Sequence, residues 1–306
     1  MDGSHKTMVT SGPYTFQITD NTLFSRDKTE IYSRNFKIGG TYPDCVNVSV
    51  IYENNKPVDA SMPILLSDPE CSFTRPLEKG GGAIIMIKTL LQYVYTQLPT
   101  LTHIKFDDKS SIECATEEEI QKGSKFRKKG TYVIPIPLYY FSIFFNGQTW
   151  YEKYFNAKQK DEVRHQQYRT RVYEFLYSPE FKTNMRFDRF VSLCDKREEE
   201  MTELYEYYNK AANFNDFFQS IPKPHRCKLV RPWIEQFMKF ILKDVFYNEN
   251  WIIQLPVEMS GGNRKPLNIS NGPPHHRRKT RKYYCPKGII TNNFQSRSVC
   301  VSPEDI

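Results

Sequence analysis

Apolar and polar residues alternate along several stretches in the first half of the chain, as they do in strands with one buried face. The stretches with the clearest alternation are residues 14–19, 45–52 and 58–66. Asn54 and Asn55 are turn residues, so the last two stretches predict a hairpin, and Pro63 places its second strand at an edge or at a bulge. Residues 103–107 predict a further strand, and residues 1–12 are expected to be irregular.

A run of three glycines precedes an apolar stripe with helical spacing in residues 77–95. Gly80, Gly81 and Gly82 let the backbone turn sharply and approach a ligand closely. The first turn of the predicted helix adds N–H groups without helical partners, at the positive end of the helix dipole. Such a segment suits a phosphate group, although a flexible turn before a core helix would show the same pattern.

Helical spacing replaces strand patterns beyond residue 157. The predicted helices cover residues 158–176, 187–194, 198–210, 214–220 and 232–246. We therefore predict an α+β protein in three parts. Residues 1–157 form a sheet with helices, residues 158–258 form a mainly helical extension, and residues 259–306 form a basic, flexible tail.

The positive charge of the chain lies mostly in that tail. The formal net charge is +8, and residues 259–306 hold nine Lys or Arg against Glu304 and Asp305. The densest basic cluster consists of Arg277, Arg278, Lys279, Arg281 and Lys282. Nucleic-acid contact, a nuclear import signal, docking on an acidic partner and a solubilising role are all consistent with such a cluster.

Seven cysteines stand far apart in the sequence, without a CxxC pair. We predict that they are reduced thiols. The first ten residues lack the apolar core of a signal peptide, and the longest apolar run, residues 138–145, is far shorter than a bilayer span. A soluble intracellular protein without a membrane partner is therefore expected.

No cluster of residues has the spacing of a metal site. His225 and Cys227 lack partners at zinc spacing, and no metal is expected. Asp107 and Asp108 stand at the end of a predicted strand, where a metal site or a catalytic base is conceivable. Since no second ligand cluster accompanies them, we interpret both as structural caps.

Residues 45–160 contain, in this order, the predicted hairpin, the helix opened by glycines, a strand and a later helix with the sequence WYEKYF. This order of elements resembles that of the GNAT-type N-acetyltransferases. Gly80 and Gly82 match the last two fixed positions of that family's cofactor motif, whereas Leu77 stands where the family has Arg or Gln. In the later helix Phe144 replaces the cofactor-facing Asn, and Asn146 stands two places away. Together with residues 106–114 and 138–157, the pattern looks similar to divergent GNAT-like proteins of large DNA viruses.

The resemblance implies a mixed central sheet flanked by helices and the transfer of an acetyl group from acetyl-CoA to an amine. The implied cofactor-binding residues are Lys79, Gly80, Gly81, Gly82, Ala83 and Asn146. Tyr151 would protonate the leaving thiolate, and Asp68 or Glu70 would deprotonate the amine. A viral protein of this kind would act in the host cytoplasm, the nucleus or the virion.

Each of these roles has a structural alternative. Tyr151 could be a packed aromatic residue, and Asp68 and Glu70 could be solvated loop carboxylates. A non-catalytic binding or virion-associated protein could keep the same fold, with its basic tail contacting nucleic acid or an acidic partner. Leu77 and the displaced Asn146 favour this alternative, whereas Gly80, Gly82 and Tyr151 favour an enzyme. The amine acceptor is not identified by the sequence.

Overall fold

The computed structural model describes residues 3–27, 29–65, 68–78, 81–112, 135–257 and 268–270. These residues fall into two compact units. Unit 1 contains the described residues up to 107, residues 155–157 and the described residues from 251 onward, whereas unit 2 contains those within 108–154 and 158–250. This division differs from the predicted boundary at residue 157, because residues 108–154 pack with the later helices.

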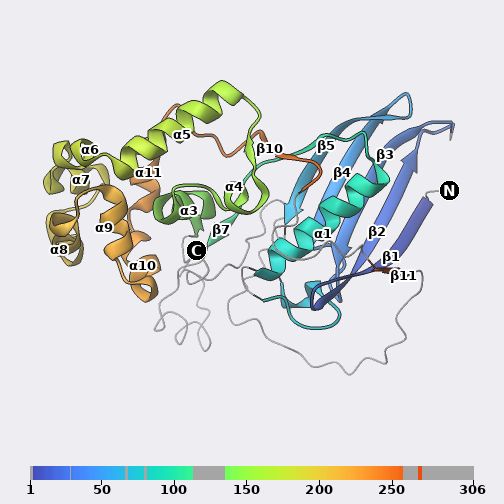
Figure 1. The fold of residues 1–306 in the computed structure, drawn as a ribbon, viewed down its shortest axis with the longest axis horizontal. Helices are drawn as coiled ribbons and strands as arrows, with labels where there is room; N and C mark the ends of the chain where they lie inside the picture. Colours follow the sequence, from blue (N-terminus) through green and yellow to red (C-terminus); the bar gives the residue numbers. More distant parts are fainter. Residues whose placement is uncertain are drawn as a thin grey trace. The chain divides into compact units, whose positions relative to one another are not determined.

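Unit 1 is built on a mixed sheet (Figure 1). Its strands are β1 (Gly3–Ser11), β2 (Tyr14–Phe24), β3 (Ile31–Gly39), β4 (Val46–Glu53), β5 (Lys56–Leu65), β6 (His103–Phe106), β10 (Trp251–Gln254) and β11 (Asn268–Ser270). They lie in the order β11-β1-β2-β3-β4-β5-β6-β10. The neighbours pair in antiparallel fashion, except that β5 and β6 are parallel.

The alternation of the sequence accounts for most of these strands. Val46, Val48 and Val50 are fully buried on one face of β4, as their spacing predicts. Asn54 and Asn55 both have positive φ in the turn of the β4–β5 hairpin. Near Pro63 the register shifts, and this confirms the predicted bulge. The expectation that residues 1–12 are irregular is wrong, since β1 pairs with β2 along its whole length.

Helix α1 (Gly81–Gln97) packs against one face of the sheet, in contact with β3 and β4. Its predicted apolar stripe supplies the contact, because Ile87, Leu90, Leu91 and Val94 are fully buried. Since α1 links the parallel strands β5 and β6, these three elements form a β-α-β unit. The structure is therefore α+β, with a large mixed sheet flanked by helices.

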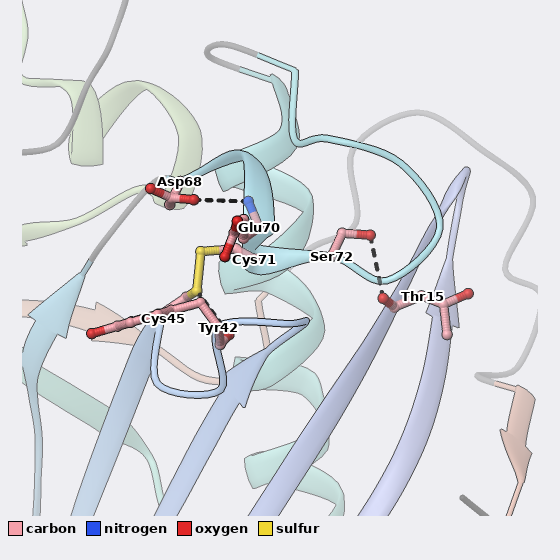
Figure 2. Close-up of a disulfide and its surroundings, with 7 residues drawn as sticks. All are labelled: Thr15, Tyr42, Cys45, Asp68, Glu70, Cys71 and Ser72. Atoms are coloured by element: carbon pink, nitrogen blue, oxygen red, sulfur yellow. Dashed lines mark hydrogen bonds between the residues drawn. A yellow bond between two sulfur atoms is a disulfide. The ribbon is translucent and has the colours of Figure 1, made fainter. Parts of the chain in front are cut away.

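A disulfide joins Cys45 to Cys71, which lie 26 residues apart in the sequence (Figure 2). It ties the loop before β4 to the short 3-10 helix η1 (Pro69–Cys71). The backbone N–H of Tyr42 donates to the carbonyl of Glu70 at 3.0 Å and connects the same two loops. Cys227 is also disulfide-bonded. The prediction of reduced thiols is therefore wrong for these cysteines, because the fold brings together residues that no sequence spacing pairs.

Unit 2 is mainly helical. Its elements are β7 (Ser111–Ile112), β8 (Ile136–Pro137), α3 (Leu138–Asn146), α4 (Trp150–Phe155), β9 (Lys158–Gln159), α5 (Glu162–Tyr177), α6 (Pro179–Asn184), α7 (Phe187–Leu193), η2 (Glu198–Glu200), α8 (Thr202–Lys210), α9 (Phe214–Ser220), α10 (Lys223–Val230) and α11 (Ile234–Leu242). Aromatic rings fill its core. The ring of Phe190 lies 5.0 Å from that of Phe237 and 5.3 Å from that of Trp233, between centroids.

The basic residues of the predicted tail lie outside the described part of the chain. They are Arg277, Arg278, Lys279, Arg281 and Lys282. Within residues 259–306 the structure describes only 268–270, and this segment is the strand β11, which pairs with β1. Among the helices that the structure describes, none is both long and apolar enough to cross a membrane.

Candidate functional site

The first turn of α1 contains the predicted phosphate-binding glycines. Lys79 and Gly80 lie outside the described residues. Gly81 is exposed, and a Cβ atom placed on it would meet no atom within 4 Å. The helix that it opens is 17 residues long, so a positive dipole end faces this open position.

Gly82 has a different role from Gly81. Its backbone N–H donates to the carbonyl of Glu78 at 3.0 Å, and a Cβ on Gly82 would lie 3.0 Å from the Cβ of Leu77. The absence of a side chain therefore lets α1 pack on Leu77, which is itself buried, as is Ala83. The structure explains Gly82 by packing, whereas Gly81 stays open to a ligand.

The parallel strands β5 and β6 pair at a single register position, Ser61 opposite Lys105. Beyond it β5 continues to Leu65, whereas β6 ends at Phe106. Ligands of parallel sheets bind beyond the carboxyl ends of the strands, beside the helix N-terminus that follows. The strand ends of this β-α-β unit therefore form a candidate anion site with the first turn of α1.

Asp68 and Glu70, the two predicted base candidates, lie in the disulfide-linked loop (Figure 2). The Asp68 Oδ1 atom accepts the backbone N–H of Glu70 at 2.8 Å and so caps η1. The side chain of Glu70 is exposed. Capping gives Asp68 a structural role, and a catalytic role for either residue stays a prediction.

Tyr151, the predicted proton donor, lies on α4 in unit 2 and is only 4% exposed. Its ring packs at right angles to that of Trp150, with 5.0 Å between centroids. Burial raises the pKa of the Tyr151 phenol well above its ordinary value, and the charge of Asp108 raises it further. The phenol therefore keeps its proton at neutral pH.

Asn146, the predicted cofactor-facing amide, is the last residue of α3. Its Oδ1 atom accepts from the Lys153 ammonium at 3.4 Å. Its Nδ2 atom is buried and has no hydrogen-bond partner among the described residues. A buried amide donor without a partner is uncommon in folded proteins, so this group is suited to a ligand acceptor.

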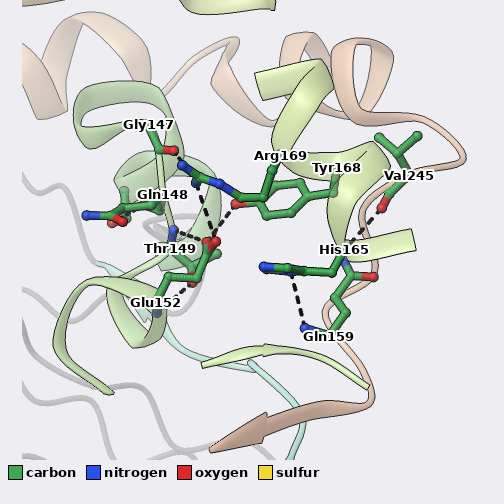
Figure 3. Close-up of polar contacts among 10 residues, drawn as sticks. Gly147, Gln148, Thr149, Glu152, Gln159, His165, Tyr168, Arg169 and Val245 are labelled. Carbon is green, nitrogen blue, oxygen red and sulfur yellow. Dashed lines mark hydrogen bonds and ion pairs between the residues drawn. The ribbon is translucent and has the colours of Figure 1, made fainter. Parts of the chain in front are cut away.

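A buried carboxylate that the sequence analysis did not single out is Glu152, on α4 (Figure 3). Its Oε2 atom accepts the backbone N–H of Thr149 and the hydroxyl of Tyr168, each at 2.7 Å, and Oε1 lies 3.4 Å from a guanidinium nitrogen of Arg169. Burial raises the pKa of Glu152, and these contacts oppose that rise. The Thr149 hydroxyl also accepts the N–H of Glu152, which completes a capping box that the sequence T-W-Y-E signals.

A second buried carboxylate, Asp108, is the first residue of unit 2. It is 1% exposed, and its Oδ1 atom accepts both the backbone N–H and the hydroxyl of Ser110. Its backbone N–H donates to the carbonyl of Asn248 at 2.6 Å. The bond to Ser110 agrees with the interpretation of Asp108 as a cap, but Oδ2 is buried without a hydrogen-bond partner among the described residues.

The environment of Asp108 changes its acidity. Burial raises the pKa of this carboxyl to about 6, and the two bonds from Ser110 oppose the rise. The charge of Glu152 also raises it. No local sequence pattern indicates this raised pKa, because it depends on burial in the folded unit and on the charge of Glu152, which is distant in the sequence.

Unit 2 also contains an open cavity of about 430 Å³ around η2. It is lined by Asp188, Val191, Ser192, Asp195, Lys196, Arg197, Glu198 and Glu200. None of the predicted site residues lines it. Within the described ranges, no group of three or more His, Cys, Asp or Glu side chains is arranged to hold a metal ion.

The sequence-predicted residues thus fall into two groups. Gly81, Gly82 and Ala83 lie with Asp68 and Glu70 in unit 1, whereas Tyr151 and Asn146 lie in unit 2, the former within electrostatic reach of Asp108. No protein-family model matches the chain, and no significant match to it exists among curated proteins or solved structures.

Proposed function

We propose that the protein is an N-acetyltransferase with a GNAT-like fold, which transfers an acetyl group from acetyl-CoA to an unidentified amine. The β-α-β unit of β5, α1 and β6 is the observation that carries this proposal. In this unit, helix α1, which begins at Gly81, follows strand β5, and β5 pairs with the parallel strand β6 at one register position. The open Gly81 and the helix dipole suit the pyrophosphate of the coenzyme.

The roles of the residues follow from their chemistry. The first turn of α1, with Gly81, Ala83 and the preceding Lys79 and Gly80, would hold the pyrophosphate. Acetyl-CoA supplies an activated thioester. The amine nitrogen bonds to the acetyl carbon and loses a proton to a base, for which Asp68 and Glu70 are the predicted candidates. The carbon–sulfur bond breaks, and an acid gives a proton to the leaving thiolate, the role that the resemblance implies for Tyr151.

A second candidate is a binding or virion-associated protein that keeps this fold without catalysis. Two observations favour it. Leu77 is buried against Gly82 where the resembling family has Arg or Gln, and the N–H of Gly82 already donates to Glu78. Contact of the basic tail with nucleic acid or an acidic partner stays a prediction, because its residues lie outside the described part of the chain.

Calorimetric titration with acetyl-CoA separates these candidates when two variants of Gly81 are compared. Gly81→Gln and Gly81→Glu add side chains of the same shape into open space, and the acidic one suits the helix dipole, so both should fold. We expect the Glu variant to lose at least about tenfold in affinity relative to the Gln variant, because its charge repels the pyrophosphate.

Two results would contradict the proposal. Equal affinity of the two variants would show that the pyrophosphate does not lie at the first turn of α1. An unmodified protein that does not bind acetyl-CoA would favour the non-catalytic candidate.

A further inference from the structure

A groove runs along the surface of unit 2 beside η2. The open cavity of about 430 Å³ adjoins a second cavity of about 190 Å³, and Lys196 and Glu200 line both. The second cavity lies against apolar side chains, among which Leu204 and Trp233 are each 2% exposed. All residues that line the two cavities belong to unit 2, so the groove is formed within one unit. Its size is that of an ordinary ligand site.

Carboxylates outnumber cations along this groove. Five acidic residues line the two cavities against Lys196 and Arg197, an excess of three negative charges, and they are Asp188, Asp195, Glu198, Glu200 and Glu203. Asp188 pairs with Arg186 at 3.4 Å, and Glu200 pairs with Arg197 at 3.5 Å. No ion pair joins the other three to a residue that the structure describes. The groove therefore presents unneutralised negative charge beside an apolar surface.

The densest basic cluster of the sequence has the complementary character. Residues 277–282 contain five Lys or Arg, and Tyr283 and Tyr284 follow directly. Guanidinium and ammonium groups are the natural partners of the groove carboxylates. An aromatic side chain next to them suits the apolar end of the groove at Leu229, Pro232 and Trp233. The basic cluster and the groove are thus matched in both charge and hydrophobicity.

We infer that the groove of unit 2 binds the basic segment, residues 277–284, of a second copy of this chain. A second copy is the source because the segment has a short tether. Ser270 is paired with β1, and the seven steps from Ser270 to Arg277 span at most about 25 Å. Five strand spacings, about 24 Å, separate β1 from β6, where the chain passes into unit 2. Crossing the sheet would therefore use up the tether, whereas a second molecule needs no such crossing.

The contact determines the kind of assembly. It is heterologous, because each molecule offers one surface and occupies a different one on its neighbour. Each copy can bind one neighbour through its groove and another through its basic segment, which gives rings or open rows of molecules. Since the charges are exposed, the attraction is weak for each pair and is screened by salt. The inference is independent of the proposed acetyl transfer.

Two complementary variants of the full chain test the contact. The groove variant carries Asp195→Asn, Glu198→Gln and Glu203→Gln. In the segment variant, five cations are each changed to Gln, and they are Arg277, Arg278, Lys279, Arg281 and Lys282. Analytical ultracentrifugation at low ionic strength and in about 0.5 M salt measures their association.

The unmodified protein should associate as its concentration rises at low ionic strength, and salt should reverse this. Each variant alone should associate at least about tenfold more weakly, because three or more charge pairs are lost. A mixture of the two variants should form a 1:1 complex, because one keeps its basic segment and the other keeps its groove. A general effect of charge would not produce this complementation.

A matched triple variant controls for the change in net charge. Asp244→Asn, Glu174→Gln and Glu249→Gln remove three charges from exposed positions of unit 2 that do not line the groove. Asp244 has positive φ, 67°, as Asp195 does at 53°, so the two aspartates are comparable in backbone conformation. This control variant should associate as the unmodified protein does.

A labelled peptide of residues 275–284 gives a second measurement, which also serves if the groove variant does not fold. Fluorescence anisotropy should show that it binds the segment variant, whose groove is not occupied by another copy. A peptide with Tyr283→Ser and Tyr284→Ser should bind at least about threefold more weakly, because the apolar contact is lost.

Four results would overturn the inference. They are an unmodified protein that stays monomeric at low ionic strength, equal weakening in the control variant, a mixture of the two variants that forms no complex, and a peptide that does not bind the segment variant.

Discussion

Glu152 and Asp108 are two carboxylates of the same unit, both buried and both with raised pKa values, yet their surroundings differ. Glu152 receives donors from Thr149, in the turn between α3 and α4, and from Tyr168 and Arg169 on α5. Among the residues that the structure describes, Ser110 alone donates to the Asp108 carboxyl, and only to one oxygen. Burial alone therefore does not distinguish the two carboxylates. The number of satisfied oxygen atoms separates them.

The same physics gives the two residues opposite energetic effects. Inside a protein a fully paired carboxylate strengthens the elements that it links, whereas a half-paired one destabilises the fold by the desolvation of its charge. Glu152 should therefore stabilise unit 2. Asp108 should reduce its stability at neutral pH.

The largest effect is expected for Glu152→Leu. The substitution leaves the N–H of Thr149, the hydroxyl of Tyr168 and the guanidinium of Arg169 without their shared acceptor, so the free energy of unfolding should fall by about 3 to 5 kcal/mol. Urea denaturation measures this. The control is Glu162→Leu, since Glu162 pairs with Lys158 on the surface, and its loss should change stability far less. Equal losses in both variants would remove the distinction between the two carboxylates.

Asp108→Asn should show a smaller effect of opposite sign that depends on pH. Because the folded pKa of Asp108 is about 6 and its ordinary value is 3.8, the folded state binds a proton more tightly than the unfolded state. The contribution to stability is present below about pH 4 and is lost as the pH rises through about 6, with a magnitude of about 3 kcal/mol. The variant should lack this loss and should be more stable than the unmodified protein at pH 8. Unfolding at pH 4 and pH 8 tests this, and a variant less stable at both would contradict it.

Tyr168→Phe should give the smallest effect. It removes one hydroxyl that donates to Glu152 at 2.7 Å and keeps the ring, so the expected loss is about 1.5 kcal/mol. Tyr173→Phe is the matched control on the same helix, because Tyr173 is 67% exposed and its hydroxyl should not contribute. Thermal unfolding of the pair resolves the difference. If Tyr168→Phe is neutral, this hydrogen bond does not stabilise unit 2, and the contrast with Asp108 is weaker than the hydrogen bonds indicate.

The spacing of apolar residues predicted those helices and strands whose buried face can be recognised within one segment of the chain. The strands around Val48 and Phe16 and the stripe of α1 follow from spacing, because each buries one face. Strand β1 was not predicted, since its first residues are polar and it becomes a strand by pairing with β2. The helix predicted through Asn146 ends there, because Gly147 takes a left-handed conformation with φ of 69°.

The features of the candidate site depend on contacts between distant residues, which no local pattern contains. Asp108 is adjacent to Asn248, and Cys45 is bonded to Cys71, although the sequence separates each pair widely. The sequence identified Asp108 only as one of two acidic residues at a strand end. Its unpaired oxygen is a property of the folded unit, so the structure was needed to distinguish it from Asp68 and Glu70.

The order of the chain has a consequence for how this protein is made. Strand β6 ends at Phe106, and its antiparallel neighbour β10 begins only at Trp251, after almost the whole of unit 2. A ribosome therefore releases the entire helical unit before the sheet of unit 1 can acquire β10. During that interval β6 presents an unpaired edge to other nascent chains, and such edges promote aggregation. A chain whose synthesis is arrested before Trp251 should thus contain a folded helical unit and an incomplete sheet. The incomplete sheet should depend on chaperones to avoid aggregation.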